Sequence, residues 1–278
     1  MTISSRCSPT LRSMKFLRKS WLILAMGYCV LPAAAQDLSP LQLPSLDALP
    51  DSLHKRPLTE LADIFATDKR ASWHNFIELY DRYLTPMQDS IHRVFEIGIF
   101  NGASHKMWKC FFDSAEIYGI DIKPKPWVEK LGIHTYIANQ AKREDLQQFI
   151  LESGGEFDVI IDDGGHYMNH QQISLGYLFE HLAPGGLYII EDVHTSLRTF
   201  YNGFGVDSTG SNTTFNMIMQ YIRTEKMESN YMTPEEKKYL EQNIEYVELY
   251  KRKNSLHSTA CVIRKKRKSG TGILREGQ

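Results

Sequence analysis

Two short apolar runs that each end in acidic residues constrain this chain more than any other feature of its sequence. The first run is Val159–Ile161, followed by Asp162-Asp-Gly-Gly-His166, and the second is Leu187–Ile190, followed by Glu191-Asp192. Both runs consist of strand-forming apolar residues and are bounded by Gly or Pro, which is typical of buried strands in a parallel sheet. We therefore expect two buried strands that both end in carboxylates.

The segment between the two runs has the pattern of a crossover helix. Apolar residues recur at helical spacing through Met168–His181, and the breaker Ala183-Pro-Gly-Gly186 follows. A strand, a helix and a second strand in this order place the two strands parallel and side by side. Adjacent strands lie about 4.8 Å apart, so the acidic residues meet at one carboxyl edge of the sheet. Open α/β sheets bind their ligands at that edge.

The carboxylates at this edge are candidate metal ligands. Asp163, Glu191 and Asp192 would raise one another's pKa unless a cation lies among them. Oxygen ligands suit a hard ion such as Mg²⁺. A single acidic residue after a strand is as well explained by a helix cap or a solvated loop. The combination of three carboxylates with His166 favours a metal site.

A glycine-containing turn earlier in the chain indicates a second binding feature. The β-rich run from Val94 ends in Glu96-x-Gly98-x-x-x-Gly102, and a helical pattern follows. Glycines here let the backbone turn sharply and let a ligand approach a helix N-terminus. The spacing differs from the dinucleotide pattern G-x-G-x-x-G, which disfavours NAD.

The next two predicted strands end in polar residues that suit a nucleoside. Glu116–Ile120 is followed by Asp121, which comes about twenty residues after the glycines, where an acidic residue accepts hydrogen bonds from ribose hydroxyls. His134–Ala138 is followed by Asn139-Gln140, where a polar side chain can meet an adenine edge. Together with the glycine turn, these positions predict a nucleoside-bearing cofactor.

The N-terminal residues differ from the rest of the chain. Basic residues precede the apolar run Trp21–Leu31, and Ala33-Ala-Ala35 offers a small-residue cleavage site. This order predicts a secretory leader over residues 1–35, with a transit peptide and an uncleaved anchor as alternatives. Export would place the protein outside the cell, in the periplasm or in an organelle lumen, and a cytoplasmic location follows if the leader is not used.

The remaining segments complete the predicted organisation. Residues 36–57 contain four prolines and read as a linker, residues 58–266 form the main domain, and residues 267–278 form a basic, flexible tail. Residues 193–214 suit a substrate loop or lid. Thr233-Pro-Glu-Glu236 predicts a capping box at the start of a helix. The last two strands, Ile244–Leu249 and Ala260–Ile263, are close enough in sequence to pair as a hairpin.

Charge and cysteine content exclude several classes of protein. The formal net charge of the 278 residues is −1, which gives no global reason to expect a nucleic-acid partner. Cys110 and Cys261 each lie in an apolar element and are predicted to be buried free thiols. The cysteine and histidine spacing matches neither a disulfide framework nor a zinc site.

Taken together, these motifs resemble a known family. Seven strands alternating with helices, with the Glu96, Gly98, Gly102 and Asp121 pattern, resemble the class I S-adenosylmethionine-dependent methyltransferases. Ile161-Asp-Asp-Gly-Gly-His166 and Gly185-Gly-Leu-Tyr-Ile-Ile-Glu-Asp192 are similar to the Mg²⁺-dependent macrolide sugar O-methyltransferases of the mycinamicin type and to the neighbouring cephalosporin hydroxylase-like family. The resemblance covers about Leu58 to Arg264 and also includes Thr67-Asp-Lys69.

The resemblance implies a fold and a set of site residues. The implied fold is α/β and Rossmann-like, a seven-stranded, mostly parallel sheet with an antiparallel C-terminal hairpin. The implied metal ligands are Asp163, Glu191 and Asp192, the implied general base is His166, and the implied cofactor contacts are Glu96, Gly98, Gly102, Asp121, Asn139 and Asp162. The chain departs from the family pattern in having Gly165 where relatives often carry Ser and Asn139 where Asp is common.

The resemblance also implies an activity. It points to an O-methyltransferase that uses S-adenosylmethionine and Mg²⁺ and acts on a hydroxyl of a sugar or glycosylated small molecule. An exported, non-catalytic nucleoside- or sugar-binding protein on the same scaffold is an alternative that the leader favours and the intact carboxylate and histidine set disfavours. Metal-assisted hydrolysis at the same carboxylates is a third. The oligomeric state is left open, a homo-oligomer included.

Overall fold

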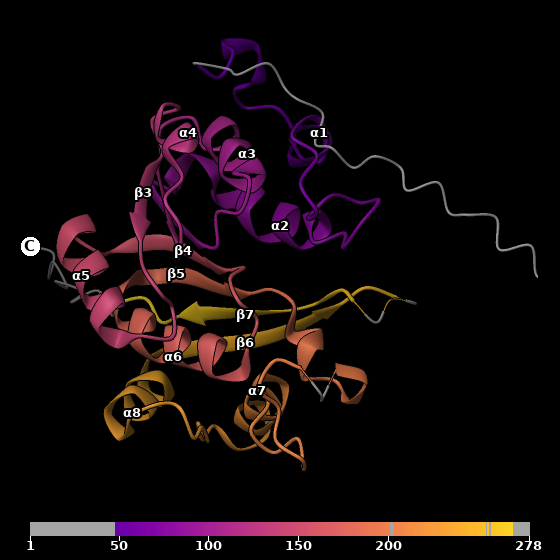
Figure 1. Ribbon diagram of the computed structural model, residues 1–278, viewed down its shortest axis with the longest axis vertical. Helices are drawn as coiled ribbons and strands as arrows, with labels where there is room; N and C mark the ends of the chain where they lie inside the picture. The colour runs from indigo at the N-terminus through magenta and orange to yellow at the C-terminus, as the bar shows by residue number, and fades with distance from the viewer. Residues whose placement is uncertain (1–47, 201–202, 254, 256, 269–278) are drawn as a thin grey trace, which may run out of the picture. The chain divides into compact units, whose positions relative to one another are not determined.

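The computed structural model describes residues 48–200, 203–253, 255 and 257–268 (Figure 1). The predicted leader at residues 1–35 lies outside these residues, as do most of the predicted linker and of the C-terminal tail. The domain boundaries proposed from the sequence therefore stay predictions. Within the described residues, no helix combines the length and the apolar character that crossing a membrane requires.

Seven strands form one sheet in the order β3-β2-β1-β4-β5-β7-β6. Their bounds are β1 Arg93–Ile97, β2 Glu116–Asp121, β3 His134–Ile137, β4 Phe157–Asp162, β5 Leu182–Ile190, β6 Ile244–Lys251 and β7 Thr259–Lys265. The first five strands are parallel, and β7 runs antiparallel to both β5 and β6. The predicted mostly parallel sheet and the antiparallel C-terminal hairpin are thus confirmed.

The helices cover both faces of the sheet (Figure 1). They are α1 Leu58–Ile64, α2 Ile77–Leu84, α3 Ala103–Phe111, α4 Pro126–Glu129, α5 Arg143–Ser153, α6 Met168–Leu178, α7 Thr214–Thr224 and α8 Pro234–Asn243. Short 3₁₀ turns are η1 Asp51–Leu53, η2 Thr85–Ser90, η3 Phe179–His181, η4 Val193–Ser196 and η5 Arg198–Phe200. The first four α-helices lie on one face, and the last four lie on the other.

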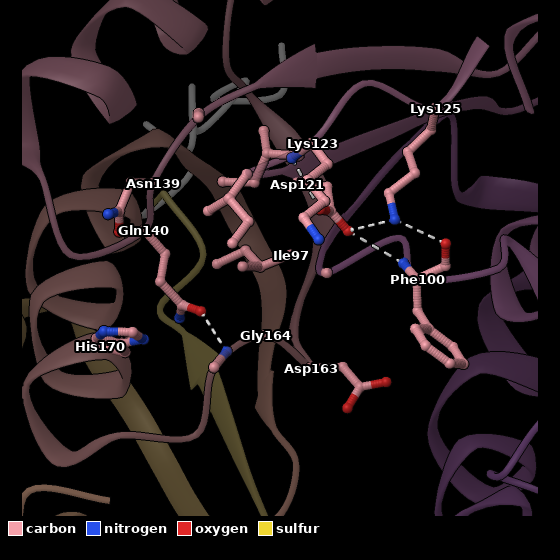
Figure 2. Close-up of a pocket in the computed structure, with 15 residues that line it drawn as sticks. Ile97, Phe100, Asp121, Lys123, Lys125, Asn139, Gln140, Asp163, Gly164 and His170 are labelled. Atoms are coloured by element: carbon pink, nitrogen blue, oxygen red, sulfur yellow. Dashed lines mark hydrogen bonds and ion pairs between the residues drawn. The ribbon is translucent and has the colours of Figure 1, made fainter.

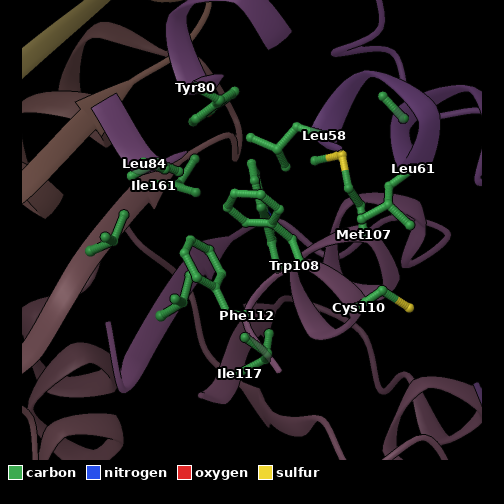
Figure 3. Close-up of a cluster of buried hydrophobic side chains, with 14 of the residues drawn as sticks. Leu58, Leu61, Tyr80, Leu84, Met107, Trp108, Cys110, Phe112, Ile117 and Ile161 are labelled. Carbon is green, nitrogen blue, oxygen red and sulfur yellow. The ribbon is translucent and has the colours of Figure 1, made fainter. Parts of the chain in front are cut away.

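Each face of the sheet has its own apolar core because side chains alternate along every strand. Val159 and Ile161 of β4 pack with α1, α2 and α3, where Trp108 and Tyr80 are completely buried (Figure 3). Ile160 faces the other way and packs with Leu146 of α5 and with α6. Strands buried on both faces explain the uninterrupted apolar runs of the sequence.

The start of β5 differs from the prediction. Ala183-Pro-Gly-Gly186 was expected to separate the crossover helix from the strand, but these residues belong to β5. The register between β4 and β5 shifts after the pair Phe157 and Leu182 and becomes regular again at Leu187. The Pro-Gly-Gly segment is therefore an irregularity at the entrance of the strand, which is where strands tolerate these residues.

Two local predictions are confirmed in detail. Thr233 Oγ1 accepts a hydrogen bond from the Glu236 backbone N–H at 3.2 Å, and Glu236 Oε2 accepts one from the Thr233 N–H at 2.8 Å, which together form the capping box of α8. Cys110 and Cys261 are buried free thiols. Burial raises the pKa of Cys110 to about 11, so this thiol is inert at neutral pH.

Candidate active site

The carboxyl edge of the sheet is assembled by backbone hydrogen bonds that continue past the ends of the strands. The Asp163 N–H donates to Ile97 O at 3.1 Å, and the Glu191 N–H donates to Asp162 O at 3.0 Å. The turns after β1, β4 and β5 are therefore held side by side. This arrangement confirms that the acidic residues after the two apolar runs meet at one edge.

Gly98 is the position where two of these turns come closest. It has φ +91°, and a Cβ atom built on it would lie 2.2 Å from the backbone oxygen of Asp163. Any side chain at this position would both strain the backbone and push Asp163 away. The first glycine of the predicted motif thus sets the distance between the glycine turn and the carboxylates.

Lys69, which the sequence did not identify as a site residue, lies among the carboxylates. Its Nζ is 3.0 Å from Glu191 Oε1 and 3.2 Å from Glu96 Oε1, and it donates a closer hydrogen bond to Asp163 Oδ2. The Tyr80 hydroxyl also donates to Glu191 Oε1. Lys69 and Glu96 are completely buried. A buried cation therefore links the ends of β1, β4 and β5.

Burial and mutual repulsion control the protonation of these groups. Burial raises the pKa of Asp163 well above its ordinary value, and the neighbouring Glu191 adds to the effect, while Lys69 opposes it. Burial likewise raises the pKa of Glu191 to about 8 against the opposing effect of Lys69. For Lys69, burial lowers the pKa, but the carboxylates, Asp163 foremost, more than compensate and raise it. The lysine therefore stays charged at neutral pH.

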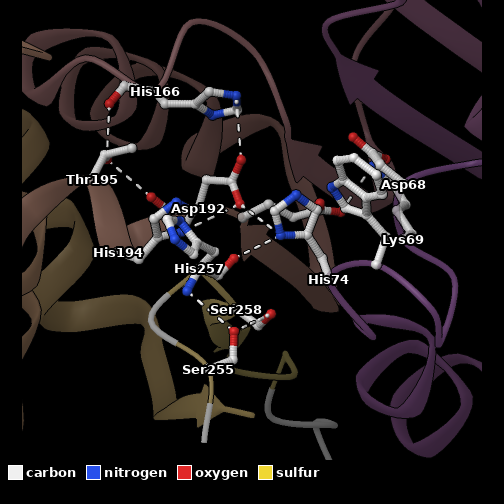
Figure 4. Close-up of polar contacts among 12 residues, drawn as sticks. Asp68, Lys69, His74, His166, Asp192, His194, Thr195, Ser255, His257 and Ser258 are labelled. Carbon is white, nitrogen blue, oxygen red and sulfur yellow. Dashed lines mark hydrogen bonds and ion pairs between the residues drawn. The ribbon is translucent and has the colours of Figure 1, made fainter. Parts of the chain in front are cut away.

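Asp192 lies among histidines (Figure 4). His166 Nε2 lies 3.5 Å from Asp192 Oδ2, and His194 Nδ1 lies 3.5 Å from Asp192 Oδ1. His74 Nδ1 lies 4.0 Å from Asp192 Oδ1 and also contacts the His257 backbone oxygen at 2.6 Å. Asp192 thus has imidazole neighbours, whereas Glu191 has the Lys69 ammonium as its neighbour.

The residues present fit a bound metal ion. Among the described residues, Asp163, His166 and Asp192 form a group whose ligand atoms all lie within 4.8 Å of one another. Asp192 Oδ1 and His166 Nδ1 are buried and have no hydrogen-bond partner within the described part of the chain. Two carboxylate oxygens with one imidazole suit a divalent ion of hard or borderline character. Asp163 and Asp192 thus come together as predicted, while Glu191 lies against Lys69 and Tyr80.

Two cavities meet at the loop that carries Asp163. The first has a volume of about 360 Å³ and is shown in Figure 2. The second, of about 300 Å³, is lined by Thr67, Asp68, Ser104 and His166 among others. Both cavities share Gly98, Phe100, Asp163 and Gly164. A ligand that fills both would pass directly beside the candidate metal group.

Three of the six predicted cofactor residues line the first cavity. These are Gly98, Asp121 and Asn139. Burial tends to raise the pKa of Asp121, but hydrogen bonds from the backbone N–H groups of Lys123 and Phe100 outweigh it and hold the pKa below its ordinary value. Asp121 is therefore a firmly ionised carboxylate on the wall of this cavity.

The other three predicted cofactor residues lie behind the cavity walls. Glu96 Oε2 accepts a hydrogen bond from Trp108 Nε1 at 2.8 Å. Asp162 accepts hydrogen bonds from Gln140 Nε2 at 2.9 Å and from the Ser174 hydroxyl, on the opposite face of the sheet from Asp163. Gly102 is the left-handed N-cap of α3, and a Cβ there would meet the Val128 side chain at 2.7 Å. Glu96, Asp162 and Gly102 therefore support the residues that line the two cavities and do not line them themselves.

Sequence reasoning missed Lys69 and His170, which the structure places at this site, and it named Gln140 only together with Asn139. Lys69 lies on the loop between α1 and α2, and no pattern in the sequence marked its side chain as buried. Gln140 lines the first cavity, and its Oε1 accepts the Gly165 N–H at 2.7 Å. His170 of α6 also lines this cavity, and its position four residues after His166 was the available signal.

Comparisons with known proteins bear on this site. No family model matches the chain. It is 39% identical over 158 residues to the mycinamicin VI 2''-O-methyltransferase of Micromonospora griseorubida, which covers 54% of this chain and 39% of that protein. It is 39% identical over 161 residues to the demethylmacrocin O-methyltransferase of Streptomyces fradiae, which covers 55% and 40% of the two proteins. The chain thus spans less than half the length of these relatives.

A solved structure extends the similarity to the fold. The MycE methyltransferase of the mycinamycin biosynthetic pathway, in complex with Mg, SAH and mycinamycin VI, superposes with a TM-score of 0.63 at 31% identity. The match covers 79% of this chain and 57% of that one. The chain therefore has the class I methyltransferase fold and is similar in both sequence and structure to the macrolide sugar O-methyltransferases.

Proposed function

We propose that this protein is an S-adenosylmethionine-dependent, Mg²⁺-assisted O-methyltransferase that acts on a hydroxyl of a sugar or glycosylated small molecule. The observation that carries the proposal is the meeting of two cavities at Gly98 and Asp163, beside a group of metal-ligating side chains. Similarity to enzymes named as macrolide sugar O-methyltransferases supports the substrate class.

The first cavity suits the nucleoside part of the cofactor. Its apolar walls, which include Ile97, Ile120 and Ile122, can hold a flat base. Asp121 Oδ2 already accepts from the Ile99 and Phe100 N–H groups and contacts Lys125, whereas Oδ1 accepts only the Lys123 N–H at 3.0 Å and keeps a lone pair for a ribose hydroxyl. Asn139 Oδ1 accepts the Ala141 N–H at 2.9 Å, which leaves the amide NH₂ of Asn139 available to a polar base edge.

Asp163 and Asp192 would hold the metal ion through their carboxylate oxygens, and His166, the third member of the group, would stay free to act as a base. A bound divalent ion lowers the pKa of a coordinated hydroxyl and fixes its position. His166 would then accept the proton that the acceptor hydroxyl loses as its oxygen bonds to the methyl carbon, while the bond from that carbon to the sulfonium sulfur breaks and S-adenosylhomocysteine leaves. Asp192, 3.5 Å from His166 Nε2, is placed to orient the imidazole and to stabilise its protonated form.

The proposal is tested by calorimetric titration with S-adenosylmethionine and S-adenosylhomocysteine, with and without Mg²⁺. We expect micromolar binding, followed by methyl transfer to members of a glycoside panel only when Mg²⁺ is present. Asp121→Ala serves as the matched variant, because it removes the proposed ribose contact and leaves Asp163, His166 and Asp192 unchanged. Absence of binding to wild type under both conditions would contradict the proposal and favour an exported binding protein.

A further inference from the structure

The role of Lys69 extends beyond filling space in the core. Its side chain is 1% exposed, and its Nζ contacts Glu96, Asp163 and Glu191. We propose that Lys69 is an internal counter-ion that shares Asp163 with the bound divalent cation, so that metal binding is an exchange of partners at Asp163. The inference rests on the proposed function only in taking a divalent metal ion as the ligand of this group.

The loop that carries Lys69 holds the lysine firmly in place. The Thr67 N–H donates to Ala62 O at 3.1 Å, and the Ile77 N–H donates to Lys69 O at 3.0 Å. The backbone on either side of the lysine is thereby tied to α1 and α2. These two hydrogen bonds fix the backbone at Lys69, so its ammonium group is a fixed element of the site.

The formal charges leave room for a second cation. Glu96, Asp163 and Glu191 carry three negative charges when ionised, and Lys69 supplies one positive charge, so an excess of two remains. Asp192, which belongs to the same metal-ligating group as Asp163, adds a further negative charge. With Asp192 the formal excess is three negative charges, of which one divalent ion would neutralise two.

Asp163 is the residue that both cations require. Its Oδ2 accepts a hydrogen bond from Lys69, and it is also a member of the group with His166 and Asp192. A metal ion bound by that group would draw Asp163 away from Lys69, which would keep Glu96 and Glu191. Lys69 should thus weaken metal binding through repulsion and through competition, while it stabilises the metal-free protein.

Lys125 provides a matched control. It is also a buried lysine, 8% exposed, whose Nζ lies 3.1 Å from Asp121 Oδ2 and 2.8 Å from Phe100 O. It lies outside the carboxylate group that surrounds Lys69. Lys69→Met and Lys125→Met each remove one buried ammonium group and keep a similar side-chain length, but only the first changes the charge beside Asp163.

The test measures Mg²⁺ affinity by calorimetry and thermal unfolding with and without Mg²⁺, on the full chain without cofactor. We expect Lys69→Met to bind Mg²⁺ about tenfold more tightly than wild type, because one nearby positive charge is gone. Its melting temperature should fall without metal and recover with Mg²⁺. Lys125→Met should lose stability without any gain in Mg²⁺ affinity. Equal or weaker Mg²⁺ binding by Lys69→Met would overturn the proposal.

A second measurement needs no destabilised variant. In wild-type protein labelled with ¹³C at lysine Cε, saturating Mg²⁺ should shift the Lys69 resonance and leave the Lys125 resonance in place, with Lys69→Arg used for assignment. An unmoved Lys69 resonance at Mg²⁺ saturation would refute the exchange. Neither measurement involves the methyl donor, so a failure to bind S-adenosylmethionine would remove the proposed function and leave this inference standing.

Discussion

Two buried lysines, Lys69 and Lys265, lie at opposite edges of the sheet and are stabilised in different ways. At the carboxyl edge, the ammonium of Lys69 is surrounded by carboxylates. At the amino edge, Lys265 donates to the backbone oxygens of Phe179, Glu180 and Leu182 at 3.1, 2.9 and 2.7 Å. It also lies 5.1 Å from the centre of the Tyr239 ring.

The difference shows why only one edge can recruit a further cation. Carbonyl dipoles stabilise a positive charge without carrying a net charge, so the three carbonyl groups around Lys265 leave no excess negative charge for a further cation. Three carboxyl groups surround the single ammonium of Lys69, and a bound cation would favour their ionised forms over the protonated forms that burial favours. Buried charge is costly unless it is paired, and the carboxyl edge is the place where that pairing is unfinished.

The largest effect is expected from removing the shared carboxylate. Asp163→Asn keeps the shape of the side chain but takes away the charge that Lys69 and the metal ion both use. Since a metal-bound hydroxyl gains several kcal/mol of stabilisation, turnover should fall by about a thousandfold or more, and Mg²⁺ dependence should disappear with it. Initial rates measured across a Mg²⁺ titration check this. Retained activity that still depends on Mg²⁺ would refute the metal assignment.

A smaller loss is expected when a histidine is removed from the same edge. His166→Ala should lower turnover by about 10²- to 10⁴-fold, the usual contribution of a general base, while S-adenosylhomocysteine binds as before. His181, in η3 at the amino edge, gives the control, and His181→Ala should leave turnover unchanged. Initial rates and calorimetric titration with S-adenosylhomocysteine, measured on both variants, show whether the loss of turnover is specific to the carboxyl edge. Unchanged turnover in His166→Ala would exclude it as the base.

The smallest effect is expected at the amino edge itself. Lys265→Met leaves three backbone carbonyl groups without their donor, which should lower the free energy of unfolding by about 1 to 3 kcal/mol. Turnover per folded molecule should not change, and Mg²⁺ should not restore the lost stability. Urea unfolding with and without Mg²⁺ checks this. If Mg²⁺ restored the stability of Lys265→Met, the proposed difference between Lys69 and Lys265 would be wrong.

The sequence predicted the features that depend on local pattern. Apolar runs such as Val159–Ile161, the crossover between them and the capping box at Thr233 each specify structure within a few residues or by simple rules of connection. The meeting of Asp163, Glu191 and Asp192 at one edge followed from the same rules. These predictions held because strand direction alone determines where the ends of parallel strands lie.

The parts that the sequence could not predict depend on distant partners. The carboxylate closest to Lys69 is 94 residues away in the chain, and no local signal distinguishes a lysine in that position from one in water. Asp162 and Asp163 are adjacent but point to opposite faces, because side chains alternate along a strand. The first is held by Gln140 and the second by Lys69, which only the folded arrangement reveals.

The position of β7 in the sheet has a consequence for biosynthesis. β7 pairs with β5 on one side and with β6 on the other, so a strand made late in translation lies between two made earlier. During translation at about 5 to 20 residues per second, the apolar edge of β5 would stay unpaired for several seconds until Thr259–Lys265 left the ribosome. An unpaired edge of this kind is prone to pair wrongly and to aggregate, so the edge of β5 is where mispairing of the nascent chain is expected.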